Sequence, residues 1–259
     1  MKFQTIEVEI AGRTARITLD RPPLNILDVP MMQEIAGSLD RLPPPVEFVV
    51  FAGTGERGFS AGAEIRDHAP ERAAKMLGAF HGIIRRLAAS DWITVSAVHG
   101  ICLGGGCELA TFCDFAIAEE SATFGQPEIK LGCFPPVAVV TFPRLIGPRA
   151  AAEMILTGRT IGAEEARELG LVSRVVPGGE ARNAASRLVE ELSSLSASAL
   201  RLARQALGQF RGPEFDAALR EAEEIYVKRL LQTGDAAEGV RAFIEKRAPV
   251  WQGRQARMR

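Results

Sequence analysis

The chain has 259 residues, 47% of them hydrophobic, and a formal net charge of −1 at pH 7. This composition is typical of a globular protein with a sizeable core, and the near-neutral charge argues against a nucleic-acid or anionic-membrane partner. No apolar run reaches the roughly 20 residues that a membrane-spanning helix needs. The N-terminus alternates and carries Glu7 and Glu9, whereas a signal peptide is continuously apolar, so we expect a cytoplasmic protein.

Strands and helices alternate along most of the chain. The pattern predicts a hairpin from residues 3–10 and 13–19, then a helix from about 30 to 41 that Asp28 caps. Further strands are expected at 46–53, 92–99, 115–120, 122–125 and 171–176, and helices at 70–89, 135–147, 149–157 and 163–169. Everything after about residue 180 is helical in pattern. This order predicts an α/β core over residues 1–195 and a helical part over 196–259, and leaves the strand order open.

Cysteines and histidines give no sign of a metal site. No two cysteines have CxxC spacing and no two histidines have HxxxH spacing, so neither a zinc site nor a redox pair is indicated. These residues are Cys102, Cys107, Cys113 and Cys133, and His68, His81 and His99. We interpret the cysteines as small buried hydrophobic residues in a reducing compartment.

Two glycine-rich segments match known motifs without their context. Gly53–Gly58 has GxGxxG spacing, but a dinucleotide site also needs a helix that opens at the third glycine, and a loop follows here. The segment Gly58–Gly62 has GxSxG spacing around Ser60. A nucleophile elbow lies directly between strand and helix and needs a downstream histidine, yet none follows His99. Neither a redox enzyme nor a serine hydrolase is favoured.

A third glycine-rich segment, Gly104–Gly106, connects a buried strand to a helix that carries Glu108 in its first turn. Glycines let a ligand approach the backbone closely, and free N–H groups of a first helical turn favour negative charge. This is the geometry of an oxyanion hole. The structural alternative is a plain glycine turn with a glutamate that the helix dipole favours.

A second carboxylate, Glu128, follows Pro127 at an expected strand end, between apolar residues. Apolar surroundings raise the pKa of a glutamate and suit it to proton transfer. Two carboxylates fit a hydration, because one group must take a proton from water and another must deliver a proton to carbon. The alternative is a surface glutamate that pairs with Lys130.

Together these segments resemble the enoyl-CoA hydratase/isomerase (crotonase) superfamily, almost from end to end. The segments that carry the resemblance are residues 21–28, 59–65, 97–118, 122–132, 164–176 and 243–254. The resemblance implies an α/β fold, a crotonase-type spiral of ββα units with a C-terminal helical trimerisation region. It further implies a homotrimer or a dimer of trimers, an acyl-CoA substrate, and no cofactor beyond the coenzyme A of that substrate.

The resemblance also assigns roles to residues. The backbone amides of Ala63 and Gly105 would form the oxyanion hole, Glu128 would protonate carbon, and Glu108 would activate water. Residues expected to bind CoA are Arg21, Pro22, Leu24, Ala61, Ala63, Glu64, Ile65, Arg66 and Lys246. Arg247 is a further candidate for contact with the CoA phosphates.

One segment departs from the common short-chain hydratases, which carry glycines where this chain has the sequence PPVAVVT at 135–141. The acyl-pocket residues are then expected to be Pro135, Pro136, Val137 and Val140. This segment, with residues 22–32, resembles cyclohexa-1,5-diene-1-carbonyl-CoA hydratases of anaerobic benzoyl-CoA breakdown. A linear enoyl-CoA hydratase, an isomerase that needs one carboxylate, and a non-catalytic CoA- or RNA-binding member remain the alternatives.

Overall fold

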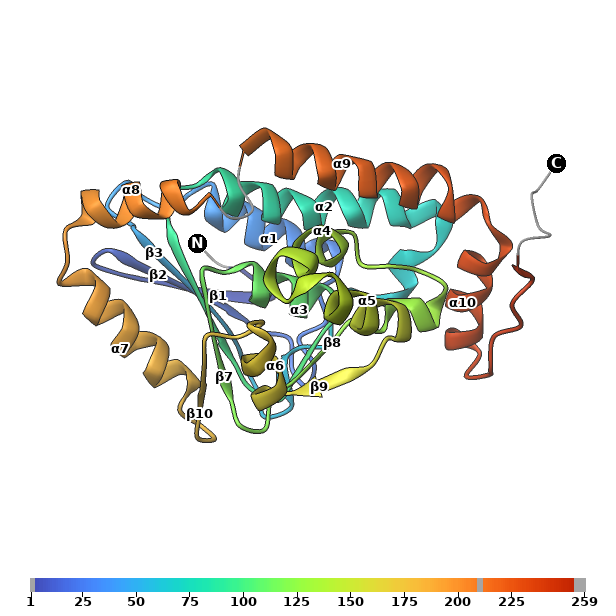
Figure 1. Ribbon diagram of the computed structural model, residues 1–259, viewed down its shortest axis with the longest axis horizontal. Helices are drawn as coiled ribbons and strands as arrows, with labels where there is room; N and C mark the ends of the chain where they lie inside the picture. The colour runs from blue at the N-terminus through green and yellow to red at the C-terminus, as the bar shows by residue number, and fades with distance from the viewer. Residues whose placement is uncertain (1–2, 209–211, 254–259) are drawn as a thin grey trace.

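The computed structural model describes residues 3–208 and 212–253, which form two sheets surrounded by helices (Figure 1). The larger sheet has the order β1-β2-β3-β5-β7-β10 and is parallel except for the hairpin of β1 and β2. Its strands are β1 (Ile6–Ala11), β2 (Thr14–Leu19), β3 (Phe48–Gly53), β5 (Ile93–Val98), β7 (Phe115–Glu119) and β10 (Arg174–Val176). The smaller sheet contains β4 (Gly58–Ser60), β6 (Ile101–Leu103), β8 (Thr123–Gly125) and β9 (Thr160–Gly162).

Helices follow the strands in a regular order. The α-helices are α1 (Val29–Leu39), α2 (Pro70–Ala89), α3 (Gly105–Phe112), α4 (Pro136–Leu145), α5 (Gly147–Thr157), α6 (Ala163–Leu169), α7 (Ala181–Ser193), α8 (Ala197–Leu207), α9 (Gly212–Lys228) and α10 (Gly234–Ile244). Short 3-10 helices are η1 (Ile65–His68), η2 (Pro127–Leu131) and η3 (Leu230–Gln232). Three times in succession the chain adds one strand to each sheet and then a helical segment, ending in α2, α3 and η2–α4. The expected spiral of ββα units is confirmed.

Strand β3 is buried on both faces, as strands of a covered parallel sheet are. Alternate side chains enter two different cores because strand side chains point to opposite faces. Phe48 and Val50 pack with buried residues of α7, whereas Val49 and Phe51 join the main core with α1 and α2. The sheet is therefore covered on both sides, which fixes the positions of its strand ends.

Element boundaries agree closely with the sequence patterns where the patterns are long. Helix α2 spans the predicted residues 70–89, and α1 begins at Val29, where the amide of Met31 donates to the capping carboxylate of Asp28 at 3.0 Å. The short strands β4, β6 and β9 were not predicted, because three residues carry no readable periodicity. All four cysteines are buried and free, as expected. Within the described residues, no helix is long and apolar enough to cross a membrane.

The two misleading glycine motifs have structural roles. Gly53–Gly58 forms the turn from β3 in one sheet to β4 in the other. Ser60 is fully buried and donates to the carbonyl oxygen of Asn25 at 2.7 Å. A Cβ on Gly106 would lie 2.6 Å from the Ser60 side chain, so the glycine allows α3 to pack on β4.

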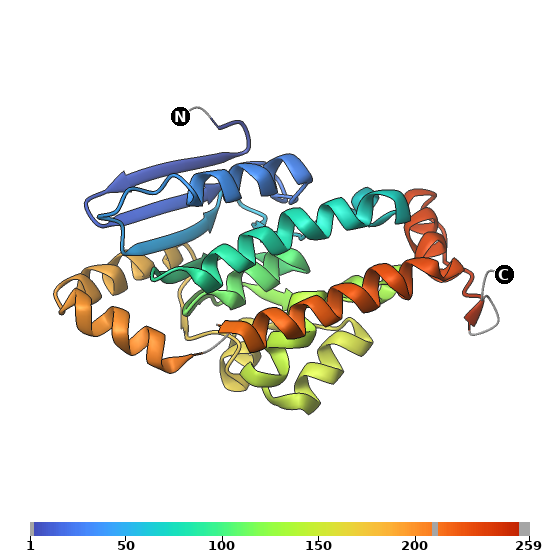
Figure 2. The same cartoon turned by 90° about the horizontal axis from the view of Figure 1, so that it is seen from above.

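The C-terminal helices pack directly on the core of the same chain. Helix α9 runs along α2, as both views show (Figure 1 and Figure 2). Helix α10 covers η2 at close range, since a Cβ on Gly132 would lie 2.7 Å from the carbonyl oxygen of Asp235, and one on Gly239 would overlap Leu131. The predicted division at residue 195 falls between α7 and α8, and the oligomerisation role of residues 196–259 stays a prediction.

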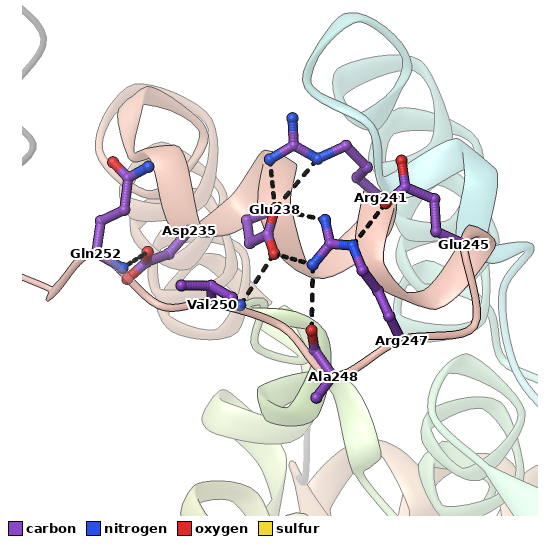
Figure 3. Close-up of polar contacts among 8 residues, drawn as sticks. All are labelled: Asp235, Glu238, Arg241, Glu245, Arg247, Ala248, Val250 and Gln252. Atoms are coloured by element: carbon purple, nitrogen blue, oxygen red, sulfur yellow. Dashed lines mark hydrogen bonds and ion pairs between the residues drawn. The ribbon is translucent and has the colours of Figure 1, made fainter.

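A buried carboxylate ties down the segment after α10 (Figure 3). Glu238 is 4% exposed and accepts hydrogen bonds from the guanidinium groups of Arg241 and Arg247 and, at 2.9 Å, from the amide of Val250. These hydrogen bonds hold the pKa of Glu238 well below its usual range. These contacts fold the residues that follow α10 back onto the helix. Lys246, which lies in this segment, is exposed.

We expect Glu238→Gln to release this segment, because the neutral amide loses the charge-assisted bonds to both arginines. Trypsin should then cleave after Arg247 severalfold faster than in the parent protein, as measured by mass spectrometry of timed digests. Glu224→Gln, which removes only an exposed helical pair with Lys228, is the matched control. Equal cleavage rates in all three proteins would contradict the anchoring role.

Candidate active site

The two predicted glutamates meet at one small cavity. Of the residues predicted for the site, the cavity is lined by Ala63, Gly105, Glu108, Glu128, Pro135 and Pro136. The remaining walls come from His68, Met76, Leu77, Phe80, His81, Phe134 and Tyr226. Its volume is about 20 Å³, room for about one water molecule, so lining side chains must move to admit an acyl group.

Glu108 lies in the first turn of α3, a helix whose residues are all buried. One of its oxygens accepts a hydrogen bond of 2.7 Å from the amide of Ala138, in the first turn of α4. The first amides of a helix have no partner within the helix and favour negative charge. The N-terminus of α4 therefore holds the Glu108 carboxylate in place from behind.

Glu128 lies in η2 and is 8% exposed, so the interpretation of a surface glutamate paired with Lys130 is wrong. The backbone of Gly104 makes room for it, since a Cβ there would lie 2.7 Å from the nearer carboxylate oxygen. The side-chain amide of buried Gln126 lies 3.2 Å from both carboxyl oxygens of Glu128. The strand that was expected to end near Glu128 is β8, which ends at Gly125. Glu128 itself lies in the helical turn that follows.

Burial raises the pKa of both carboxyl groups above the ordinary range. For Glu108 the amides of Ala138 and Val137 counteract the effect of burial in part. For Glu128 the charge of Glu108 adds to the effect of burial. Two neighbouring carboxyls in a site that disfavours charge share their protons, so they titrate as a coupled pair.

The amides of Ala63 and Gly105 lie next to each other at the edge of the cavity. A Cβ built on Gly105 would be 3.7 Å from the Ala63 nitrogen, and Gly62 approaches the Leu103 carbonyl so closely that its own Cβ would be 2.8 Å from that oxygen. Gly105 is the first residue of α3, so its N–H has no helical acceptor. In the part of the chain that the structure describes, neither amide donates to a protein acceptor. Both are therefore available to a ligand oxygen.

The structure separates the four residues predicted for the acyl pocket into two groups. Pro135 and Pro136 line the cavity, whereas Val137 and Val140 do not, because α4 begins at Pro136 and turns Val137 into the core. Helices α2 and α9 supply the opposite wall instead. His68 and His81 also line the cavity, a role that their spacing in the sequence did not indicate. Residues 3–208 and 212–253 contain no cluster of three or more side chains that could hold a metal ion.

The two segments expected to bind CoA lie side by side. The amide of Ala61 donates to the Leu24 carbonyl at 2.8 Å, and Leu27 exchanges hydrogen bonds with Gly62 and Glu64 at 2.9 and 3.0 Å. Buried Asn25, at φ 47°, holds this arrangement through bonds of its side chain to the carbonyls of residues 54 and 58. Contact of either segment with CoA stays a prediction.

The basic residues assigned to CoA differ in how free they are. The guanidinium of Arg21 pairs with Asp28, and that of Arg247 pairs with Glu238 and Glu245. Arg66 is exposed and borders a surface hollow together with Arg72, Lys75, Asp28 and Asp67, among others. Lys246 is exposed as well. Because the guanidinium of Arg247 is already paired, exposed Arg66 and Lys246 are the better candidates for contact with the CoA phosphates. Their binding of CoA stays a prediction.

Glu128→Gln should stabilise the protein most at alkaline pH. Burial and Glu108 raise the pKa of Glu128 from 4.5 to about 8, so the folded state binds more protons than the unfolded state between these values. The free energy of unfolding contributed by this group therefore falls as the pH rises through that window. Thermal unfolding near pH 5 and near pH 8 should show a larger gain in Tm for the variant at the higher pH. The same gain at both pH values would contradict the assignment.

Comparison with known proteins identifies the family of this chain. The family model described as enoyl-CoA hydratase/isomerase matches residues 9–254. A cyclohexa-1,5-dienecarbonyl-CoA hydratase of Thauera aromatica is 35% identical over 95% of this chain and 96% of its own. A protein of Mycobacterium bovis named as a probable enoyl-CoA hydratase is 41% identical over 96% of this chain and 98% of its own.

Solved structures agree as well. The enoyl-CoA hydratase of Mycobacterium avium subsp. paratuberculosis superposes with a TM-score of 0.85 at 29% identity, covering 96% of this chain and 99% of that one. The carnitinyl-CoA hydratase of Mycobacterium avium superposes with a TM-score of 0.82 at 32% identity, covering 97% and 99%. The match of the family model over nearly the whole chain, and relatives this similar along their full length, show that the protein belongs to the enoyl-CoA hydratase/isomerase family.

Proposed function

We propose that this protein adds water to a double bond conjugated to a CoA thioester, and that its substrate is cyclohexa-1,5-diene-1-carbonyl-CoA. It is a hydro-lyase of the enoyl-CoA hydratase type. One observation carries the proposal: two buried carboxylates and two available backbone amides surround the same cavity. That set supplies both proton transfers and the charge stabilisation that a hydration requires.

In the proposed reaction the thioester oxygen accepts hydrogen bonds from the amides of Ala63 and Gly105. Glu108 takes a proton from water as the water oxygen forms a bond to the β-carbon, and the electron pair of the double bond moves toward the thioester oxygen. The two amides stabilise the resulting enolate, at roughly 3 kcal/mol of the barrier per donor. Glu128 then delivers its proton to carbon, and proton exchange between the carboxyls and solvent restores the starting state.

The surroundings of the carboxyls support this division of roles. The amide of Ala138 stabilises Glu108 as an anion, which suits a base. The charge of Glu108 raises the pKa of Glu128 further, which keeps Glu128 protonated and suits an acid. Because the two groups share their protons, the assignment describes the dominant distribution in a coupled pair.

Two observations favour a cyclic substrate. Pro136 stands in the cavity wall at a position where the PGAGGTQ-like segment of short-chain hydratases carries a glycine, so this wall is bulkier and stiffer. The similar protein of Thauera aromatica is named for the cyclic diene. A linear enoyl-CoA is the second candidate, because relatives with 40–41% identity are named simply as enoyl-CoA hydratases. The expected trimeric or hexameric assembly, the cytoplasmic location and the absence of a cofactor belong to the same proposal.

The test measures loss of the conjugated thioester absorbance with crotonyl-CoA and, separately, with cyclohexa-1,5-diene-1-carbonyl-CoA. We expect fast hydration of the cyclic diene and slow hydration of crotonyl-CoA. Glu128→Gln and Glu108→Gln should each lower kcat by roughly 10²–10⁴-fold, since each removes one proton transfer. Glu120→Gln, which changes an exposed carboxylate after β7, is the matched control and should leave kcat unchanged.

The other outcomes separate the alternatives. Fast hydration of crotonyl-CoA would assign a linear substrate and show that residues 135–141 do not select a ring. Movement of the double bond without hydration would indicate an isomerase. Binding of both thioesters without any reaction would indicate a non-catalytic member of the family.

A further inference from the structure

His81 on α2 has one ring nitrogen that the protein does not satisfy. Its side chain is fully buried and lines the cavity that holds the two glutamates. Nδ1 lies 2.6 Å from a carboxylate oxygen of Glu223 on α9. Nε2 is buried as well and has no hydrogen-bond partner among the described residues. A buried polar atom without a partner is costly, so this atom requires an explanation.

The charged groups next to His81 determine which of its ring nitrogens carries the proton. Arg85 donates to the second oxygen of Glu223 at 2.8 Å and to Asp216 at 2.9 Å. Burial alone would raise the pKa of Glu223, but the hydrogen bonds from His81 and Arg85 lower it to about 2, so this carboxylate is ionised. An ionised carboxylate only accepts hydrogen bonds, which requires that Nδ1 carry the proton.

The ring itself is neutral. Burial and the nearby charge of Arg85 together lower the pKa of His81 below its usual value, although the Glu223 carboxylate opposes them. A neutral imidazole with its proton on Nδ1 has a lone pair on Nε2, so Nε2 is an acceptor. The other polar groups of this wall, His68 and Tyr226, already contact each other at 3.1 Å. Glu128 and the free amides of Ala63 and Gly105 line the same cavity, but none of them is a hydrogen-bond partner of Nε2. A donor for Nε2 therefore has to enter the cavity with a ligand or a water molecule.

We propose that His81 is a specificity-determining residue whose Nε2 accepts a hydrogen bond from a hydroxyl group on the acyl part of the ligand. The proposal rests on the binding of acyl-CoA in this cavity, as proposed above. Hydration of the proposed cyclic diene, which itself carries no hydroxyl, places one on the β-carbon of the product. A substrate other than this diene would carry a hydroxyl farther along the acyl group. In either case the cavity distinguishes a hydroxylated acyl group from the corresponding hydrocarbon.

The experiment compares ligands in the Glu128→Gln protein, which lacks the acid needed for turnover. Dissociation constants are measured calorimetrically for cyclohexanecarbonyl-CoA and for its 2-hydroxy and 4-hydroxy derivatives. We expect one hydroxylated thioester to bind roughly tenfold more tightly than the parent, the effect of one buried neutral hydrogen bond. Preference for the 2-hydroxy ligand would identify the product hydroxyl, and preference for the 4-hydroxy ligand would identify a substrate hydroxyl.

His81→Phe in the same background should abolish this preference and leave the affinity for the unsubstituted ring within about twofold. His99→Phe is the matched control, because His99 contacts the Gly55 carbonyl outside the cavity and should keep the preference. A preference that survives in His81→Phe, or equal binding of all three ligands to the parent, would overturn the proposal. Equal binding would leave water as the partner of Nε2.

A spectroscopic measurement covers the case in which His81→Phe does not fold. The ¹⁵N chemical shifts of His81 at neutral pH should show a protonated Nδ1 and an unprotonated Nε2. A proton on Nε2 would overturn the acceptor role whatever the binding data show. If none of the three thioesters binds, the proposed function itself fails, an outcome distinct from equal binding of all three.

Discussion

The structure is organised around two carboxyl groups held close together away from water. Such a pair is unfavourable, because burial disfavours each charge and the two charges repel. Specific groups offset this cost: the first turn of α4 donates a hydrogen bond to Glu108, and the polar side chain of Gln126 lies 3.2 Å from the Glu128 carboxyl. Gly104 provides the space that lets both approach the same cavity. The surrounding sheets and helices hold the residues that make these contacts in position.

Long, regular patterns in the sequence predicted the structure well. Helix 70–89 and the cap at Asp28 follow from local rules, and Glu108 was placed correctly because its helix begins just after a glycine turn. The position of Glu128 depended on resemblance, because its own neighbourhood was equally consistent with a surface residue. That side chain faces a cavity whose walls come largely from α2 and α9, which lie far from it in the sequence.

Other features could not be read from local sequence. Each strand of the smaller sheet has only three residues, so it exists because neighbouring turns of the spiral stack on it. The spiral repeats its ββα unit without any repeat in the sequence, since packing demands only apolar strands and small residues at the corners. His81 and Tyr226 meet at the cavity because α2 and α9 pack side by side, a contact that no spacing rule reveals.

The close packing of α10 against η2 affects the order in which parts of the enzyme can fold during synthesis. The turn that carries Glu128 rests on a helix that is synthesised much later, after more than a third of the sequence has been added between them. A nascent chain can complete both sheets while α10 is still inside the ribosome. The turn that carries Glu128 reaches its final packing only when the C-terminal helices have emerged, later than the sheets of the core.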